Sequence, residues 1–336
     1  MLVGQETDTT TATDVAAGTA FALLIALAVA SREPRDAQPA ELRSALDAVG
    51  DSEGESWLNL LGVGLDAGAP YTAETLAGAL RGLDGLEIRR HLLGRYAWSW
   101  CTLGGIDDIE AAATGDAAAA GRLLATPRYY GGDAASSLGV LIALDADETK
   151  RRLIDAVDVA RSTLLPADAP DALAAAGQQA EEQLASDPLP DAIERLTTGY
   201  RYVPELEADR VVLMPHLEAS LPLVLAQHRS ARLIAYRARA DRGAEARMLA
   251  LGRALSDAKR VEILALVGRG MGRSSALVEA TGLSRSTVHH HLAQLRDAGL
   301  VALEGNARAY TYVPRHEAVV EIGELIGAIV GTEEER

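Results

Sequence analysis

The segment SRSTVHHHLAQLRDAGLV, residues 284–301, places three histidines side by side at His289, His290 and His291. Imidazole is a common zinc ligand and titrates near neutral pH, so the triplet raises the question of a metal site or a catalytic site. Successive residues of an α-helix point about 100° apart, and metal pairs on helices use positions i and i+3 or i and i+4. Three adjacent histidines therefore do not converge on one ion, and the sequence offers no fourth ligand.

Other chemistry-bearing patterns are equally weak. The single cysteine, Cys101, excludes an internal disulfide framework and a multi-cysteine zinc site, and we interpret it as a small buried hydrophobic residue. The glycine-rich stretch LGVGLDAGAP, residues 61–70, lacks the Lys-Ser/Thr of a phosphate loop. No local Ser/His/Asp or Cys/His arrangement is present. We therefore expect no metal, no cofactor, no catalytic residues and no enzymatic activity.

The histidines instead lie in a pattern typical of a helix-turn-helix. A first helix is predicted over about 275–281, Gly282 suits a tight turn with positive φ, and Ser284 is a suitable N-cap for a second helix. Another helix is predicted to begin after Ser256 as its N-cap. Beyond Gly299, the sequence LVALEGNARAYTYV has two strand-like runs around a Gly-Asn turn. A helix-turn-helix followed by such a hairpin is a winged helix.

In the second helix, helical spacing puts Val288, Leu292 and Leu295 on one apolar face. His291 lies beside that face, and we expect it to be packed and hydrogen-bonded. His289 and His290 are better placed to face DNA, although both could be merely solvated polar residues. The predicted DNA-binding residues of this helix are Arg285, Ser286, Thr287, His289, His290 and Gln294. Predicted phosphate contacts come from Lys259, Arg260, Arg273 and, at the hairpin tip, Arg308.

The charge distribution supports a nucleic-acid partner. Residues 253–316 contain nine Arg/Lys and five Asp/Glu, a net charge of +4. The whole chain carries −16, so the remaining residues carry −20. A basic C-terminal segment attached to an acidic body is typical of a separate DNA-binding module.

From LSDAKRVEILALV through ATGLSRSTVHHHLAQLRDAGLV to the hairpin, the chain resembles the ArsR-type winged-helix transcriptional regulators. The resemblance covers about the last quarter of the chain. It implies a dimer that binds duplex DNA, with the second helix in the major groove and the wing on the backbone or minor groove. Metal-sensing members have a cysteine-containing motif in the helix before the recognition helix. Here that helix reads SSALVEATG, without cysteine, so metal sensing through that site is not expected.

The first 240 residues look mainly helical, with short strands expected at 210–217 and 232–238. The apolar run of residues 16–30 is shorter than the roughly 20 residues of a membrane span, and no Lys or Arg precedes it, so we expect a buried helix in a cytoplasmic protein. The aromatic residues of this region could belong to the core or could line an apolar effector pocket. The candidate walls of such a pocket are Trp57, Trp98, Trp100 and Tyr130.

The run EAVVEIGELIGAIVG, residues 317–331, predicts an apolar terminal helix that packs on its own domain or, as we favour, on its twin across a dimer axis. The expected fold is mainly α with a small β element: a helical regulatory or dimerisation domain over 1–245 and a winged helix-turn-helix with a C-terminal dimerisation helix over 246–336. We expect a homodimeric DNA-binding regulator of the repressor type, with a possible small-molecule effector. A protein-docking scaffold is the alternative, and an enzyme fused to a DNA reader is a third class.

Overall fold

The computed structural model describes residues 11–34, 36, 38–126, 129, 133–197, 199–238, 244–305 and 310–330. The chain is mainly helical with a small β component, as predicted. It divides into two compact units, both discontinuous in sequence. Unit 1 comprises Met1–Glu181 and Glu205–Ala238, and unit 2 comprises Glu182–Pro204 and Arg239–Arg336. The backbone therefore passes between the units three times.

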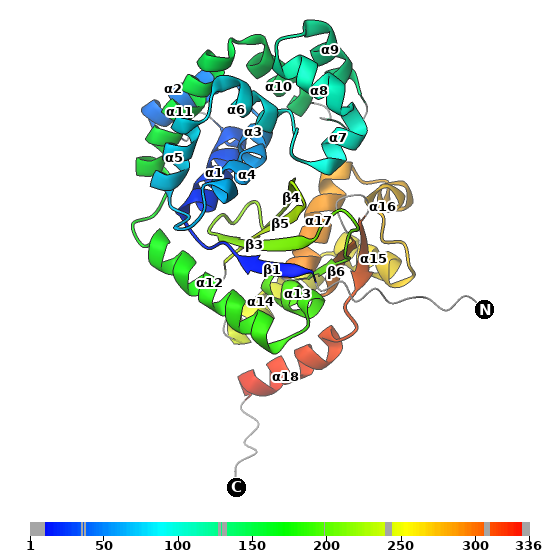
Figure 1. The fold of residues 1–336 in the computed structure, drawn as a ribbon. Helices are drawn as coiled ribbons and strands as arrows, with labels where there is room; N and C mark the ends of the chain where they lie inside the picture. The colour runs from blue at the N-terminus through cyan, green and yellow to red at the C-terminus, as the bar shows by residue number, and fades with distance from the viewer. Residues whose placement is uncertain are drawn as a thin grey trace, which may run out of the picture. The chain divides into compact units, whose positions relative to one another are not determined.

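Unit 1 contains a four-stranded sheet in the order β1-β3-β5-β4 (Figure 1). The strands β1 and β3 run parallel, as do β3 and β5, whereas β4 is antiparallel to β5. The strands predicted at 210–217 and 232–238 are confirmed as β3 and β5. The strand β1, which is only four residues long, was not among the strands predicted. The strand bounds are β1 Ala12–Val15, β3 Arg210–His216, β4 Leu223–His228 and β5 Ala231–Arg237.

The apolar run near the N-terminus forms α1, Thr19–Arg32, which is buried continuously from Ala20 to Ser31. A helix that is apolar on every side is stable only when other elements surround it. Here α1 packs on β3 and on several helices of unit 1. Among the described residues, no helix is long and apolar enough to cross a membrane. The prediction of a buried helix is confirmed.

Further helices complete unit 1 around α1 (Figure 1). The last of them, α12, extends past Glu181 into unit 2. Their bounds are α2 Ala40–Val49, α3 Glu55–Asn59, α4 Leu61–Asp66, α5 Ala73–Gly82, α6 Gly85–Leu92, α7 Trp98–Gly104, α8 Ile106–Ala113, α9 Ala117–Ala125, α10 Asp133–Ala143, α11 Ala146–Thr163 and α12 Ala169–Ser186.

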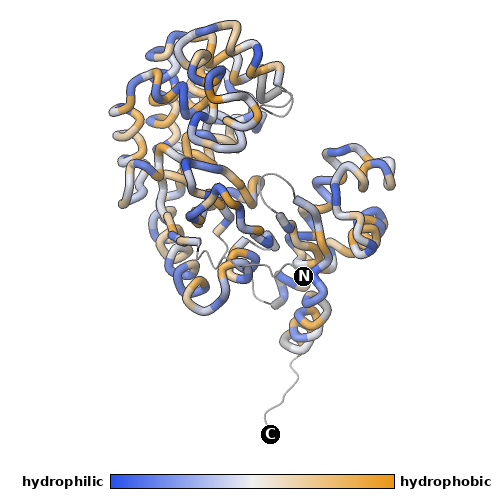
Figure 2. The backbone as a smooth tube through the Cα atoms, turned by 45° about the vertical axis from the view of Figure 1, so that its right-hand side comes forward, coloured by the Kyte–Doolittle hydropathy of each residue, from blue (hydrophilic) through white to orange (hydrophobic). Residues whose placement is uncertain are grey.

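Unit 2 consists of helices and a three-stranded sheet in the order β2-β6-β7. The helix α17 packs against α15, α16 and β6, and α14 packs against α18. The bounds are α13 Leu189–Thr197, β2 Tyr200–Tyr202, α14 Ala244–Leu255, α15 Ala258–Gly268, α16 Ser274–Thr281, α17 Arg285–Asp297, β6 Val301–Gly305, β7 Tyr310–Pro314 and α18 Ala318–Val330. Figure 2 shows α18, the helix that leads to the C-terminus, as a mixture of apolar and polar turns.

Candidate nucleic-acid interface

The turn between α16 and α17 is built by two residues with specific backbone chemistry. Gly282 has φ 67°, a left-handed conformation that glycine adopts without the cost of a Cβ atom. The Ser284 Oγ accepts a hydrogen bond from the Thr287 N–H at 3.1 Å and so caps α17. Both predicted turn residues are confirmed. Together they fix the point and direction in which α17 begins.

The buried face of α17 fixes which side chains point outward. Val288, Leu292 and Leu295 are completely buried, at helical positions i, i+4 and i+7. Their packing against α15, α16 and β6 prevents the helix from rotating about its axis. The opposite face therefore has a defined set of exposed side chains.

His290 is exposed on that face, with the half-buried Thr287 and Gln294 beside it, and Arg285 is exposed at the first turn of the helix. The His290 Nε2 lies 2.9 Å from the Gln294 Nε2, one helical turn away, and the Thr287 Oγ1 lies 2.7 Å from the Ser284 Oγ. The Ser286 backbone is helical, but its side chain lies outside the described residues. Together, the guanidinium, imidazole, amide and hydroxyl groups offer both donors and acceptors to the edges of base pairs.

The three adjacent histidines have three different environments. His291 is buried as predicted, and burial lowers the pKa of its imidazole, but its Nδ1 has no hydrogen-bond partner among the described residues. His289 is half-buried, and burial together with Arg285 lowers its pKa. His290 is exposed. Within the described ranges, no group of three His, Cys, Asp or Glu side chains could hold a metal ion.

The predicted phosphate contacts also differ from one another. Lys259 and Arg273 are exposed, and the Lys259 Nζ lies 2.8 Å from the Glu262 carboxylate. Arg260 donates instead to the backbone carbonyls of Ala254 and Arg253 at 2.8 and 2.6 Å. Its guanidinium therefore caps the C-terminus of α14, a geometry that favours a structural role over the predicted phosphate contact. Arg308 lies outside the described residues.

The N-cap of α15 is one residue later than expected. The Asp257 carboxylate accepts a hydrogen bond from the Arg260 N–H at 2.9 Å, whereas the Ser256 hydroxyl donates to the Arg253 carbonyl. The predicted cap at Ser256 was wrong because serine and aspartate are both strong N-caps and stand next to each other here.

The wing is the antiparallel pair β6–β7, in which Val301 is opposite Pro314 and Gly305 is opposite Tyr310. A third strand, β2, pairs with β6 in parallel, with Tyr200 opposite Leu303. The Tyr200 hydroxyl donates to the Gly305 carbonyl at 3.0 Å. The sequence analysis missed β2, since a three-residue strand about 100 residues before its partner has no periodic signal. The only hint was the alternation of two tyrosines with Arg201.

The comparisons with known proteins agree with this geometry. Residues 257–302 match the family described as "Bacterial regulatory protein, arsR family". The chain is 39% identical over 71 residues to the HTH-type transcriptional regulator YgaV of Escherichia coli (strain K12), which is 21% of this chain and 72% of that protein. The chain belongs to the arsR family of bacterial regulatory proteins. It is also 35% identical over 91 residues, 26% of this chain and 76% of the relative, to the HTH-type transcriptional regulator CmtR of Mycobacterium tuberculosis (strain ATCC 25618 / H37Rv). No solved structure matches significantly.

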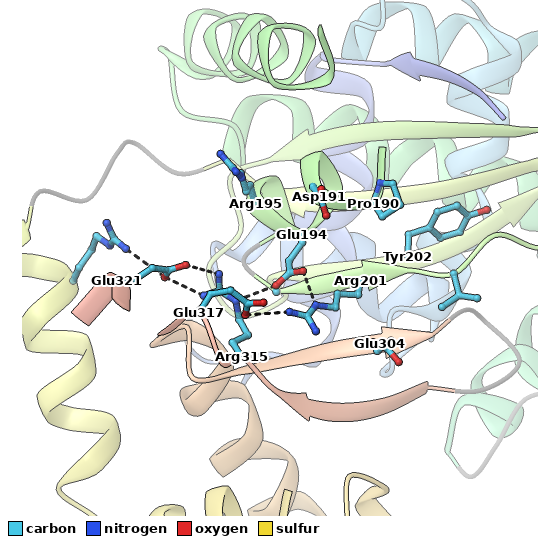
Figure 3. A pocket seen from close by; sticks show the side chains of 13 residues that line it. Pro190, Asp191, Glu194, Arg195, Arg201, Tyr202, Glu304, Arg315, Glu317 and Glu321 are labelled. Atoms are coloured by element: carbon cyan, nitrogen blue, oxygen red, sulfur yellow. Dashed lines mark hydrogen bonds and ion pairs between the residues drawn. The ribbon is translucent and has the colours of Figure 1, made fainter. Parts of the chain in front are cut away.

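Arg315, which follows the wing, connects the arsR-family segment to the α13–β2 segment through hydrogen bonds and ion pairs. Its guanidinium donates to Glu194 of α13 at 3.0 Å and to Glu321 of α18 at 2.8 Å (Figure 3). It also donates to the Gly299 carbonyl at 3.1 Å. Burial acts to lower the pKa of Arg315, but the two carboxylates outweigh it and raise the pKa. Glu194 also accepts from Arg201 of β2 at 2.6 Å. This network connects the base of the wing, the end of α17 and the upstream segment.

These side chains border a hollow of about 1060 Å³ (Figure 3). Four arginines and five carboxylates line it, and most of them are paired with each other; the residues are Pro190, Asp191, Glu194, Arg195, Gly199, Arg201, Tyr202, Val203, Arg247, Glu304, Arg315, Glu317 and Glu321. Because the opposite charges nearly cancel, the hollow is not suited to an isolated anion such as a phosphate.

The three candidate effector residues that the structure describes, Trp57, Trp98 and Trp100, lie in unit 1 in different surroundings. Trp57 is fully buried, and its indole N–H donates to the Ser31 hydroxyl at 3.0 Å, which places it in the core. Trp98 is half-buried with the Arg232 guanidinium 5.0 Å from its ring. Trp100 lines a cavity of about 90 Å³ together with Tyr96, His91 and His228, and the sequence did not single out the two histidines as cavity walls. Tyr130 lies outside the described residues.

Proposed function

We propose that this protein is a homodimeric transcriptional regulator that binds a duplex operator through α17, with the wing on the DNA backbone. The observation that carries this proposal is that Arg285 and His290 are exposed and Gln294 is half-buried on a helix whose apolar face is buried in the core. In the winged-helix geometry, base edges are reached from the N-terminal half of the recognition helix, and phosphates by flanking basic residues. Ser286, Thr287, His289, Lys259, Arg273 and Arg308 complete the proposed interface.

Selection from a random duplex library tests this proposal. We expect an enriched inverted repeat, because two copies of α17 related by a two-fold axis read two half-sites. Affinity should fall steeply with salt, since each phosphate contact releases counterions. Recovery of no enriched sequence at moderate salt would contradict the proposal and favour the alternative, a scaffold whose winged helix docks protein. The net charge of +4 over residues 253–316 is the reason we prefer DNA.

A dimer interface on α18 is supported by an apolar face that its own unit leaves exposed. Leu325 is buried, and α18 packs against α14, yet Ile326, Ile329 and Val330 are 47%, 43% and 70% exposed. Leu249 of α14 is also exposed. Large apolar side chains gathered on a terminal helix are typical of an interface between subunits.

Sedimentation of variants tests this interface. Replacing both Ile326 and Ile329 by lysine should shift the protein toward monomer and weaken operator binding, because one subunit reads only one half-site. Glu324→Lys is the matched control, since it adds a lysine on the exposed opposite side of the same helix. An unchanged dimer in the double variant would place the interface elsewhere.

Unit 1 is proposed to regulate DNA binding by unit 2 in response to a small molecule in the cytoplasm. The protein would then act as a repressor or as another kind of regulator. Unit 1 is far larger than DNA binding alone requires. The residues outside 253–316 carry −20, so long-range electrostatics favours a neutral or cationic effector over an anion.

A further inference from the structure

The cavity of about 90 Å³ in unit 1 lies along the edge of a β-strand. Five consecutive residues of β4, Val224 to His228, line it. Successive side chains of a strand point to opposite faces, so a cavity that contacts all five must follow the edge of the strand. The sheet order β1-β3-β5-β4 makes β4 an outer strand. Its free backbone edge therefore faces the cavity.

The register of the β4–β5 pair identifies which backbone groups point into the cavity. The Arg237 N–H donates to the Pro222 carbonyl at 3.1 Å, and hydrogen-bonded and non-hydrogen-bonded pairs alternate along an antiparallel ladder. The N–H and C=O groups of Leu225 and Gln227 thus point away from β5. Within the described part of the chain, these groups have no hydrogen-bond partner. A strand edge of this kind presents neighbouring donors and acceptors to a ligand.

One buried side-chain nitrogen beside this edge also lacks a partner among the described residues. The Gln227 Oε1 accepts from the Ser99 N–H at 2.9 Å, which fixes the amide and leaves its buried Nε2 without a partner among the described residues. His91, which lines the cavity beside it, is only 5% exposed. Burial lowers the pKa of His91 to about 4, so its ring is neutral near pH 7 and offers one donor and one acceptor. Unpaired buried polar atoms are costly, which indicates a site that a polar ligand would complete.

The walls of the cavity are flat and firmly held. The His91 ring lies 4.7 Å from the Tyr96 ring and stacks on His228 at 5.6 Å. The His228 Nε2 is 3.0 Å from the Asp66 carboxylate, and a Cβ atom on Gly62 would come within 2.2 Å of its Nδ1. The ring is therefore confined on both sides. Such walls favour a planar ligand.

The cavity favours an uncharged ligand. The pKa of His228 is lowered by burial, as is that of His91, so both imidazoles are neutral at pH 7. Glu55, the one carboxylate in the lining, is 3.2 Å from Arg32, and burial raises its pKa. A volume of about 90 Å³ is smaller than the roughly 150 Å³ cavity that binds benzene, so at most a single small ring can enter.

We propose that this cavity binds an uncharged, planar, single-ring ligand with a lactam-type edge, in which an N–H and a C=O stand side by side. The edge would bond to the outward backbone groups of β4 and to the Gln227 Nε2, and the ring would lie against His91. Only the description of this ligand as the effector rests on the proposed function. Binding itself does not.

Titration calorimetry of the full-length, DNA-free protein with 2-pyridone tests the proposal. N-methyl-2-pyridone is the matched control ligand, because it keeps the ring and the carbonyl but has no N–H. We expect saturable binding of 2-pyridone. N-methyl-2-pyridone should bind at least about fivefold more weakly, because it cannot make one of the hydrogen bonds. His91→Phe and Gln227→Leu should each weaken 2-pyridone binding by about the same factor.

Four outcomes are distinguishable. Binding that discriminates the two rings and is weakened in both variants supports the site. No heat from 2-pyridone, or equal binding of both rings by wild type and folded variants, overturns it. Thermal unfolding of each variant shows whether it is folded, and His C–H signals in NMR spectra report His91 directly in wild type. Failure of the duplex selection would remove the effector role and leave the binding site intact.

Discussion

Replacing Arg315 by methionine would remove the cation that joins α13, α18 and the end of α17, while keeping an unbranched side chain. Arg315 and Glu194 are 18% and 14% exposed, so their pair lies between a surface pair, worth up to about 1 kcal/mol, and a buried pair, whose disruption costs about 3–5 kcal/mol. Glu194 keeps Arg201 as a partner in the variant. We therefore expect unit 2 to lose about 2–3 kcal/mol of local stability.

Hydrogen exchange measured by mass spectrometry can locate this loss. The Leu303 N–H donates to the Gly199 carbonyl, so peptides that cover β2 and β6 report the opening of the sheet. Their protection should fall by about 30- to 150-fold, since each tenfold corresponds to about 1.4 kcal/mol. Arg195→Met is the control: Arg195 pairs with Asp187 at 3.4 Å but is 66% exposed, and its loss should change protection little.

The same variant separates a positioning role from a DNA contact. All of the tryptophans belong to unit 1, so the unfolding transition seen by fluorescence should not move. Operator affinity should fall with an unchanged dependence on salt, because the guanidinium of Arg315 is already engaged by Glu194, Glu321 and Gly299. Unchanged protection of β2 and β6 would refute the stability argument. A salt slope reduced by about one would show that Arg315 binds a phosphate.

Three further predictions concern the interface and the core. His290→Ala should reduce discrimination at one base pair of each half-site by about 1–3 kcal/mol, measured on a panel of operator variants; equal loss on every variant would contradict base recognition. Arg308→Ala should weaken all duplexes similarly and lower the salt slope by about one, and a changed sequence preference would refute this assignment. Burial lowers the pKa of His216 to about 3. Below about pH 6.5 this imidazole is protonated in the unfolded chain, whereas in the folded state it remains neutral down to about pH 3. The free energy of unfolding of unit 1 is thus highest above pH 6.5 and declines as the pH falls. The variant His216→Asn keeps an acceptor for the Glu218 N–H. It should flatten this decline by about 1.4 kcal/mol per pH unit, as measured by tryptophan-monitored unfolding. An unchanged slope would show that His216 is not responsible.

The helix-turn-helix could be predicted because its signals are local. Gly282 and Ser284 satisfy backbone requirements a few residues away, and the buried positions Val288, Leu292 and Leu295 follow the period of the helix. The exposed face of α17 follows from the same period. The direction of a long side chain beside this face does not follow from the helical period. Arg260, for example, donates to the carbonyls of α14 instead of pointing to solvent.

Features that depend on distant parts of the chain could not be predicted. Tyr200 meets Leu303, and His91 stacks on His228 across 137 positions of sequence. No periodicity connects such partners, since each segment is stabilised only when the other is in place. The aromatic residues illustrate the same limit: residue type marks Trp57 and Trp100 as large, but only the fold puts Trp57 in the core and Trp100 beside a cavity.

The parallel pairing of β2 with β6 has a consequence for synthesis on the ribosome. Tyr200 and Tyr202 leave the ribosome about 100 residues before Leu303 and Gly305, their partners. At roughly 5–20 residues per second, β2 waits about 5–20 seconds without a strand to pair with. The helices α15 to α17 form from neighbouring residues and can assemble as they emerge, whereas the wing sheet closes only after β6 has emerged. A translational pause within this window would prolong the exposure of two aromatic side chains that the finished protein buries.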